Sequence, residues 1–251
     1  MIDVHTHLLP GVDDGSPSID VSLPVLERFA ADGVEVVVCT PHLDASRAGQ
    51  APYDRHVEIL AQLRAQAPEK PELKLGWEIM LDVPRADLRD TRLSLGGSTA
   101  VLVEFPRMMI PPNAAEELFR LRMSGIVPVL AHPERYWSCT TERVEEWRRV
   151  GAVIQMDVAG VFAAGPQGTL AASLLEQGLV DLLASDTHGD ARALAPARKW
   201  LVELGADDIA ELLTRRNAGH LLANEPIEPV PPVERHKGMF GRLKELLLGR
   251  S

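Results

Sequence analysis

The chain has 251 residues, of which 45% are hydrophobic and 25% charged, so it can bury a full core and is not an intrinsically disordered chain. Its 36 acidic and 26 basic residues give a net charge of −10, which argues against nucleic acid as a partner because phosphate backbones need a basic surface. Two cysteines exclude a disulfide scaffold, and no apolar run reaches the roughly 20 residues of a membrane-spanning helix. With no signal peptide pattern at the amino terminus, we expect a cytoplasmic protein.

Seven apolar, β-branched runs alternate with helical patterns, as is typical of strands that are buried on both faces. The predicted strands are 1–4, 34–40, 73–79, 100–105, 126–131, 152–158 and 179–184. The predicted helices are 20–32, 54–67, 113–124, 141–150, 168–177, 191–204, 207–214 and 216–222, with Asp54, Asn113 and Thr141 as N-caps. Alternation of this kind predicts a single α/β domain, a closed or nearly closed parallel barrel.

The end of the chain has a different composition. Residues 225–234 are rich in proline, which predicts an extended linker. Residues 239–248 carry a short amphipathic pattern, either a helix packed on the body or a contact for a partner or membrane surface. We therefore predict a barrel over residues 1–225, followed by a linker and a short helix over residues 226–251.

Histidines and carboxylates occur where the predicted strands end, and the carboxyl ends of parallel strands meet at one face. The set is His5, His7, Asp13, Asp14, His42, Glu78, Glu104, His132, Asp186 and His188. Buried carboxylates need compensating charge, and divalent cations supply it. Imidazole and carboxylate without thiolate suit Mn, Fe or Zn, and the set is large enough for two or three ions. Such ions activate water and neutralise a phosphoryl group.

Other phosphate chemistries lack their residues in this sequence. A cysteine phosphatase needs an arginine six positions after its cysteine, but Cys39 is followed there by Ala45 and Cys139 by Glu145. The sequence contains neither the glycine-rich phosphate loop nor the Gly-x-Ser-x-Gly nucleophile turn. Both cysteines are therefore predicted to be structural.

Taken in order, the motifs resemble the PHP (polymerase and histidinol phosphatase) superfamily and, more narrowly, the bacterial capsular and exopolysaccharide tyrosine-protein phosphatases. They are Asp-Val-His-Thr-His from residue 3, Pro-Gly-Val-Asp-Asp-Gly from 10, Thr-Pro-His from 40, Gly-Trp-Glu-Ile from 76, Val-Glu-Phe from 103, Ala-His-Pro-Glu-Arg-Tyr from 131 and Ser-Asp-Thr-His from 185. The resemblance runs from residue 1 to about residue 225 and implies a distorted seven-stranded, TIM-like (β/α)7 barrel of PHP type.

The resemblance also implies a site with two to three divalent metal ions, most often Mn²⁺. The ligands that it implies are His5, His7, Asp14, His42, Glu78, Glu104, His132, Asp186 and His188, with Glu78 and Glu104 as bridges. Arg135 and Arg192 are implied near the phosphate, and Asp13 beside the ligands. The chain departs from the family at Gly189 and Asp157, where asparagine is usual, and both departures concern the substrate pocket.

The activity so implied is hydrolysis of phosphotyrosine by a metal-activated hydroxide. The implied substrate is the tyrosine-rich tail of a bacterial kinase that controls polysaccharide export. Two alternatives stay open at this point. One is a small-molecule phosphomonoesterase such as histidinol-phosphate phosphatase, and the other is a non-catalytic module that binds the kinase.

Overall fold

Parallel strands form the centre of the molecule, which the computed structural model describes over residues 1–234. The first sheet has the order β1-β2-β4, with β1 (Ile2–Thr6), β2 (Val36–Cys39) and β4 (Glu72–Leu75). The second has the order β3-β5-β6-β7-β8-β9, with β3 (His42–Asp44), β5 (Glu78–Met80), β6 (Ala100–Glu104), β7 (Val127–Ala131), β8 (Val153–Asp157) and β9 (Leu182–Ala184).

The two sheets are two parts of one ring of seven strand positions. The chain passes from β2 to β3 and from β4 to β5, and β3 pairs with β5 as β2 pairs with β4. A single unbroken strand over residues 73–79 was therefore a wrong prediction, and β3 was not predicted. Pro41 has no N–H to offer a ladder, and a Cβ at Gly76 would lie 2.9 Å from Leu95 Cδ2, so the chain bends where it is close to its neighbour.

The ring is completed between β9 and β1 by contacts just beyond β9. An isolated parallel bridge joins Thr6 to Thr187. His7 N donates to Thr187 O at 2.8 Å, and Asp186 N donates to His5 O at 3.0 Å. The prediction of a parallel α/β barrel is confirmed, with a seam between β1 and β9 that has no continuous ladder.

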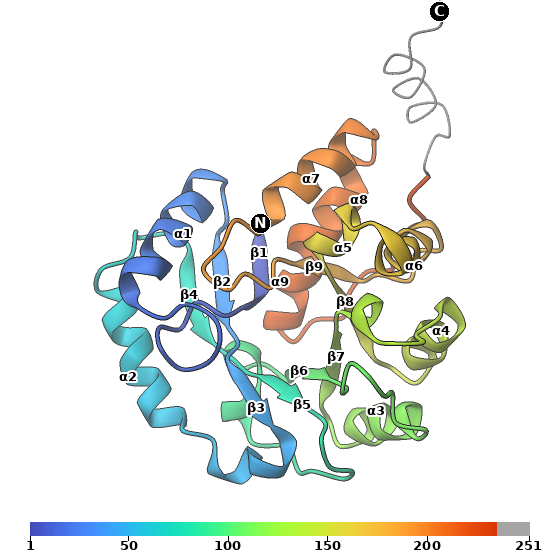
Figure 1. The fold of residues 1–251 in the computed structure, drawn as a ribbon, viewed down its shortest axis with the longest axis horizontal. Helices are drawn as coiled ribbons and strands as arrows, with labels where there is room; N and C mark the ends of the chain where they lie inside the picture. Colours follow the sequence, from blue (N-terminus) through green and yellow to red (C-terminus); the bar gives the residue numbers. More distant parts are fainter. Residues whose placement is uncertain (235–251) are drawn as a thin grey trace, which may run out of the picture.

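Helices surround the strands (Figure 1). They are α1 (Ile19–Ala31), α2 (Tyr53–Arg64), α3 (Ala114–Met123), α4 (Thr141–Arg149), α5 (Val158–Phe162), α6 (Gly165–Glu176), α7 (Leu194–Glu203), α8 (Asp207–Glu211) and α9 (Asn217–Leu222). The short α5 was not predicted. Asn113 is the N-cap of α3, but Thr140 rather than Thr141 caps α4, and Pro52 rather than Asp54 precedes α2. The cap of α4 was misplaced by one residue because two threonines stand in succession.

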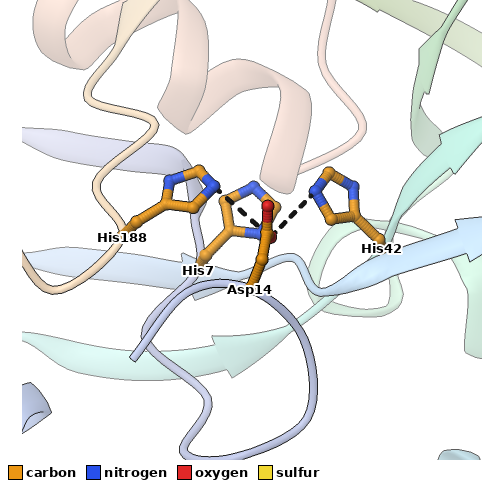
Figure 2. Close-up of side chains that lie close together, drawn as sticks. All are labelled: His7, Asp14, His42 and His188. Atoms are coloured by element: carbon orange, nitrogen blue, oxygen red, sulfur yellow. Dashed lines mark ion pairs between the residues drawn. The ribbon is translucent and has the colours of Figure 1, made fainter. Parts of the chain in front are cut away.

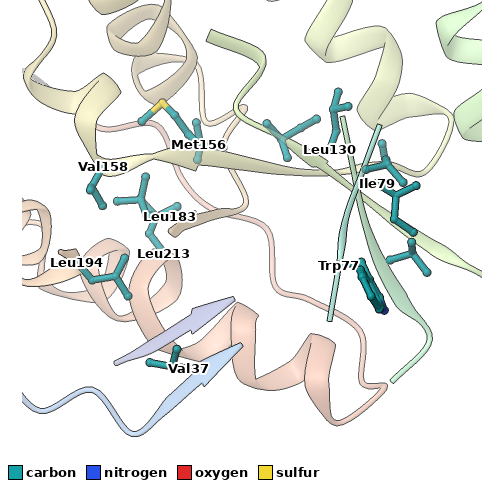
Figure 3. Packing of buried hydrophobic residues seen from close by; sticks show 14 of the residues in the cluster. Val37, Trp77, Ile79, Leu130, Met156, Val158, Leu183, Leu194 and Leu213 are labelled. Atoms are coloured by element: carbon teal, nitrogen blue, oxygen red, sulfur yellow. The ribbon is translucent and has the colours of Figure 1, made fainter. Parts of the chain in front are cut away.

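Alternation along the strands divides the core into two layers. On β6, Ala100 and Leu102 face the barrel interior, whereas Val101 and Val103 belong to the layer under the helices. Figure 3 shows part of this outer layer. The same period carries Glu104 inward, so the interior is apolar at the amino ends of the strands and polar at the carboxyl ends.

Residues 226–234 form neither helix nor strand and lie against the body. Val230 and Val233 are buried in the core, and Val233 N donates to Leu175 O at 2.9 Å. The predicted amphipathic segment 239–248 lies outside the described residues, and the domain boundary at residue 225 stays a prediction. Within residues 1–234, no helix combines the length and the apolar composition needed to cross a membrane.

Candidate metal centre

The nine side chains predicted as metal ligands lie together at the carboxyl ends of the strands. Their potential ligand atoms form four overlapping groups, and within each group all atoms lie within 4.8 Å of one another. The groups are His7, Asp14, His42 and His188; His5, Glu78 and His132; His5, His7 and Asp186; and His42, Glu78 and Glu104. Residues far apart in the sequence thus share one mouth of the barrel.

Four buried ligand atoms, from His5, His7, Glu78 and Asp186, lie close together and form what we call the innermost group. The Nε2 atoms of His5 and His7 are 3.3 Å apart. Each lies 3.2 Å from Glu78 Oε2, and they lie 3.4 and 3.2 Å from Asp186 Oδ1. Ligand atoms that share one ion at about 2.0–2.2 Å are separated by roughly 3 Å, so these four atoms have the spacing of a metal shell.

The position of His5 depends on an irregularity in β1. The register of β1 against β2 shifts between Asp3 and Thr6. Asp3 Oδ1 accepts hydrogen bonds from Ser185 N at 3.1 Å and from His5 N at 3.4 Å, so the buried aspartate holds the shifted backbone. Irregularities of this kind redirect side chains beside functional sites.

Glu78 connects the innermost group to a second one. Its Oε1 lies 2.7 Å from His132 Nε2, while its Oε2 lies 3.1 Å from His42 Nδ1. Glu104 lies farther out, 3.8 Å from His132 Nε2 and 3.9 Å from His42 Nδ1. Burial, together with the charge of Glu78, raises the pKa of Glu104. Glu78 and Glu104 thus both lie between His42 and His132, and each would be available to divalent ions held there.

The outer group consists of His7, Asp14, His42 and His188, which lie close together in Figure 2, and all but His7 are at least partly exposed. Asp14 Oδ1 lies 3.3 Å from His42 Nε2 and 3.6 Å from His188 Nε2. The Asp14 side chain is 71% exposed, against 37% for His42 and 22% for His188. A ligand can therefore reach the cluster from this side.

The buried carboxylates of the cluster attract positive charge, and divalent cations can supply more of it than protonation of the histidines. Burial by itself lowers the pKa of His5, but Glu78 and Asp186 outweigh it and raise that pKa to about 9. Among residues 1–234, no lysine or arginine pairs with Glu78 or Glu104. The lone pairs of imidazoles and carboxylates converge without a permanent positive charge at Glu78, so the donor set fits divalent cations.

Two polar residues hold the innermost imidazoles by their other nitrogens. Asp13 Oδ2 lies 2.7 Å from His7 Nδ1, and Gln155 Oε1 lies 2.9 Å from His5 Nδ1. Such contacts fix the ring orientation and the tautomer of metal-binding histidines. Asp13 was predicted beside the ligands. Gln155 was not singled out, although the period that puts Val153 inside the barrel also puts Gln155 there.

The family described as capsular polysaccharide synthesis, CpsB/CapC, matches residues 1–223. The chain belongs to this family. The resemblance indicated by the motifs is thereby confirmed.

Relatives of the chain extend over nearly its whole length. It is 27% identical to tyrosine-protein phosphatase YwqE of Bacillus subtilis (strain 168), over 96% of this chain and 99% of the relative. It is 28% identical to tyrosine-protein phosphatase CpsB of Streptococcus agalactiae serotype III (strain NEM316), over 90% and 100%. A solved structure from work on YwqE of Bacillus subtilis and CpsB of Streptococcus pneumoniae, called unique metal-dependent tyrosine phosphatases, matches with a TM-score of 0.72, 25% identity, and coverage of 94% of this chain and 100% of that chain.

The two predicted arginines lie beside the cluster and already contact carboxylates. Arg135 Nη1 lies 2.6 Å from Asp186 Oδ2 and 3.1 Å from Asp157 Oδ2. Arg192 Nη1 lies 3.1 Å from Asp186 Oδ2, and its Nε lies 2.9 Å from Asp190 Oδ2. Both guanidinium groups bind the oxygen of Asp186 that faces away from His5 and His7, so they orient this carboxylate.

The structure shows the neighbours of Asp157 and Gly189, the two positions at which the chain departs from the family. The buried Asp157 pairs with Arg135, which gives it a charged partner. Gly189 has a φ of +85°, and a Cβ there would lie 2.7 Å from Val21 Cγ1. An asparagine at position 189 would therefore be strained in this chain.

Exposed apolar side chains stand in the loops beside the cluster. Met108 and Met109 follow β6 and are 76% and 70% exposed, and Trp137 follows β7 and is 70% exposed. The two loops are joined, since Trp137 N donates to Arg107 O at 2.8 Å. These residues were not predicted to belong to the site, because exposure cannot be read from the sequence.

Proposed function

We propose that this chain is a metal-dependent protein-tyrosine phosphatase of capsular or exopolysaccharide synthesis. The observation that carries the proposal is that the buried Glu78 carboxylate contacts four histidines, His5, His7, His42 and His132, at an open mouth of the barrel in a chain of the CpsB/CapC family. Its curated relatives carry the name tyrosine-protein phosphatase.

The nine ligands would hold two to three divalent ions, for which Mn²⁺ is our first choice and Fe or Zn also suits the donor set. Bound ions would supply Lewis acidity and would lower the pKa of water, so that a nucleophile for phosphorus is available at neutral pH. Asp13 and Gln155 orient the imidazoles of His7 and His5, and Arg135 and Arg192 keep Asp186 in place. Because a phenolate leaves with a pKa near 10, the reaction does not require a strong general acid.

The surroundings of the centre favour a protein substrate. The open outer group admits a group that projects from a chain, and Met108, Met109 and Trp137 offer apolar surface for an aromatic ring and its neighbours. We propose phosphotyrosine in the tyrosine-rich tail of a polysaccharide-export kinase as the substrate. A cytoplasmic location is part of the same proposal.

The test is a substrate panel with full-length protein loaded separately with Mn²⁺, Zn²⁺ or Fe²⁺, with metal content measured by elemental analysis. We expect hydrolysis of p-nitrophenyl phosphate and of a phosphotyrosine peptide, and its loss on chelation. Faster turnover of histidinol phosphate than of the peptide would replace the protein substrate by a small molecule. No metal uptake and no hydrolysis of any substrate would refute the enzyme and favour the non-catalytic module.

A further inference from the structure

A cavity adjoins the metal centre. It has a volume of about 270 Å³ and lies between the loop with Gly11 and Val12, the 3₁₀ segment Ala45–Gln50 and the start of α2. His42, one of the predicted metal ligands, forms part of its wall. Whatever fills this cavity would therefore lie next to a group bound at the metal centre.

The cavity is lined by more positive than negative charge. Arg47 and Arg55 both contribute to its wall, and neither guanidinium has a hydrogen-bond or ion-pair partner within residues 1–234. Asp44 is the acidic residue of the lining. By contrast, Arg89 and Arg92 each bind an aspartate two positions away. In a chain with a net charge of −10, two unpartnered guanidinium groups on one cavity are available for an anion.

The cavity wall also includes a buried side chain with an unpartnered polar atom. His56 lines the cavity, is 5% exposed, and stacks on Trp77 with ring centroids 4.6 Å apart. Its buried Nδ1 has no hydrogen-bond partner. Buried polar atoms are normally satisfied, so an orphan beside a cavity needs an explanation. The first turn of α2, which has no side-chain cap, forms the adjoining wall and adds a partial positive charge.

Size limits the occupant. The volume of about 270 Å³ is below the roughly 300–1,000 Å³ typical of small-molecule sites, so the cavity suits one side chain rather than a whole free metabolite. Guanidinium groups bind carboxylates and phosphates through paired hydrogen bonds.

We propose that this cavity binds an anionic side chain of the substrate peptide, close in sequence to the phosphotyrosine whose phosphate occupies the metal centre. The inference rests on the proposed phosphatase function and adds a specificity subsite to it. The anionic side chain is an aspartate or glutamate, or a second phosphotyrosine, and both offer the same oxygen chemistry to Arg47 and Arg55.

The experiment measures kcat and KM of the metal-loaded full chain on a set of phosphotyrosine peptides. One glutamate is placed in turn at each of the positions flanking the phosphotyrosine, and each such peptide has a glutamine counterpart. A parallel pair carries a second phosphotyrosine or an unmodified tyrosine at the same positions. We expect the anionic peptide to have a kcat/KM about tenfold higher at the matching position, chiefly through KM, because the contact is made equally in ground and transition states. The pair that shows the larger ratio identifies the occupant.

The variants connect this preference to the cavity. Arg47→Ala/Arg55→Ala should remove the preference and leave kcat on p-nitrophenyl phosphate, which has no flanking residues, unchanged. Arg47→Glu/Arg55→Glu should instead favour lysine-flanked peptides. The matched control, Arg122→Ala/Arg149→Ala, removes two arginines from a cavity at the opposite end of the barrel and should keep the preference.

Three results would overturn the inference. They are no preference at any position in the unaltered protein, a preference that survives Arg47→Ala/Arg55→Ala, and a preference that the control variant also loses. If peptides and p-nitrophenyl phosphate are hydrolysed in these cases, the proposed function stands and only the subsite fails. If neither is hydrolysed by metal-loaded protein, both fail together.

Discussion

The two ends of the barrel bury acidic side chains in opposite ways. At the amino ends, Asp181 is 2% exposed and is satisfied by the chain itself, with Arg148 Nη2 at 2.7 Å and Ile154 N at 2.8 Å. At the carboxyl ends, Glu78 is 1% exposed, and all its ion-pair partners within residues 1–234 are imidazoles. A buried carboxylate by itself therefore says little about function; the nature of its partners distinguishes the two ends.

Cavity volume alone would identify the wrong end of the barrel as the functional site. The amino end carries a cavity of about 720 Å³ lined by Arg148 and Asp181, which already bind each other. The cavity beside the metal centre is smaller, about 270 Å³, although the neighbouring carboxylates of Glu78 and Glu104 lack a lysine or arginine partner within residues 1–234. A buried carboxylate that is paired within the chain, such as Asp181, contributes to the fold, whereas a carboxylate of the metal centre such as Glu78 remains free to bind cations.

The largest expected effect tests the carboxyl end directly. His5→Ala/His7→Ala removes two of the four atoms of the innermost group and should lower phosphatase activity by far more than about 100-fold, the upper range for residues that only support a ligand. Activity and bound metal should fall together in steady-state assays and elemental analysis. Full activity of the double variant would remove the distinction between the two ends.

Asp13→Asn should have the next largest effect. The variant keeps every ligand but weakens the acceptor at 2.7 Å from His7 Nδ1, so we expect metal affinity or activity to drop by about 10–100-fold. Metal titration followed by thermal unfolding separates weaker binding from a damaged fold. An unchanged metal affinity would show that His7 needs no orienting partner.

Arg148→Ala tests the amino end and should change stability rather than activity. Removing one partner of a fully buried pair costs roughly 3–5 kcal/mol, and because Arg148 is 27% exposed we expect about 2 kcal/mol here. Urea unfolding measures the loss, and p-nitrophenyl phosphate turnover of the folded variant should be unchanged. A loss of turnover without a loss of stability would contradict the contrast between the ends.

The same variant predicts a pH dependence. Burial raises the pKa of Asp181, and Arg148 opposes this rise. Without the arginine, the folded-state pKa lies still farther above the unfolded value of about 3.9. The folded state then binds the proton more tightly, so the destabilisation should be smallest near pH 4 and grow as the pH rises through the folded-state pKa. Unfolding of both proteins at several pH values checks the sign.

The smallest expected effect concerns the apolar rim, by which we mean the exposed side chains Met108, Met109 and Trp137 beside the cluster. Trp137→Ala should raise KM for a phosphotyrosine peptide by about threefold to tenfold, or roughly 0.7–1.4 kcal/mol, and leave stability within about 0.5 kcal/mol. Turnover of p-nitrophenyl phosphate is the control. An equal KM for the peptide would exclude the apolar rim from substrate binding.

Much of the metal centre could be predicted from the sequence, because the period of the strands and the parallel topology both place these residues at the same end of the barrel. Glu104 stands in a strand whose period points it inward, and His5 and His7 follow a strand whose carboxyl end must reach the shared mouth. These inferences need only the strand period and the parallel connection. These residues can therefore be predicted from the sequence alone.

Other features depend on contacts between distant segments, which no local pattern encodes. The register shift in β1 follows from Asp3 bonding to Ser185 N across the seam, and the break at Gly76 follows from the closeness of Leu95. Gln155 gains its role only because His5 lies opposite it. The arginines were placed near the site, but their pairing with Asp186 depends on the αL backbone at that residue, with a φ of 47°.

The seam between β1 and β9 has a mechanical consequence. His5 and His7 stand on one side of it and Asp186 and His188 on the other, so an ion held by both sides would act as a clasp between the first and last strands. The amides of His7 and Asp186 cross the seam, and their hydrogen exchange should slow when the clasp is fastened. The metal ions that would serve the reaction would therefore also stabilise the closure of the barrel between its first and last strands.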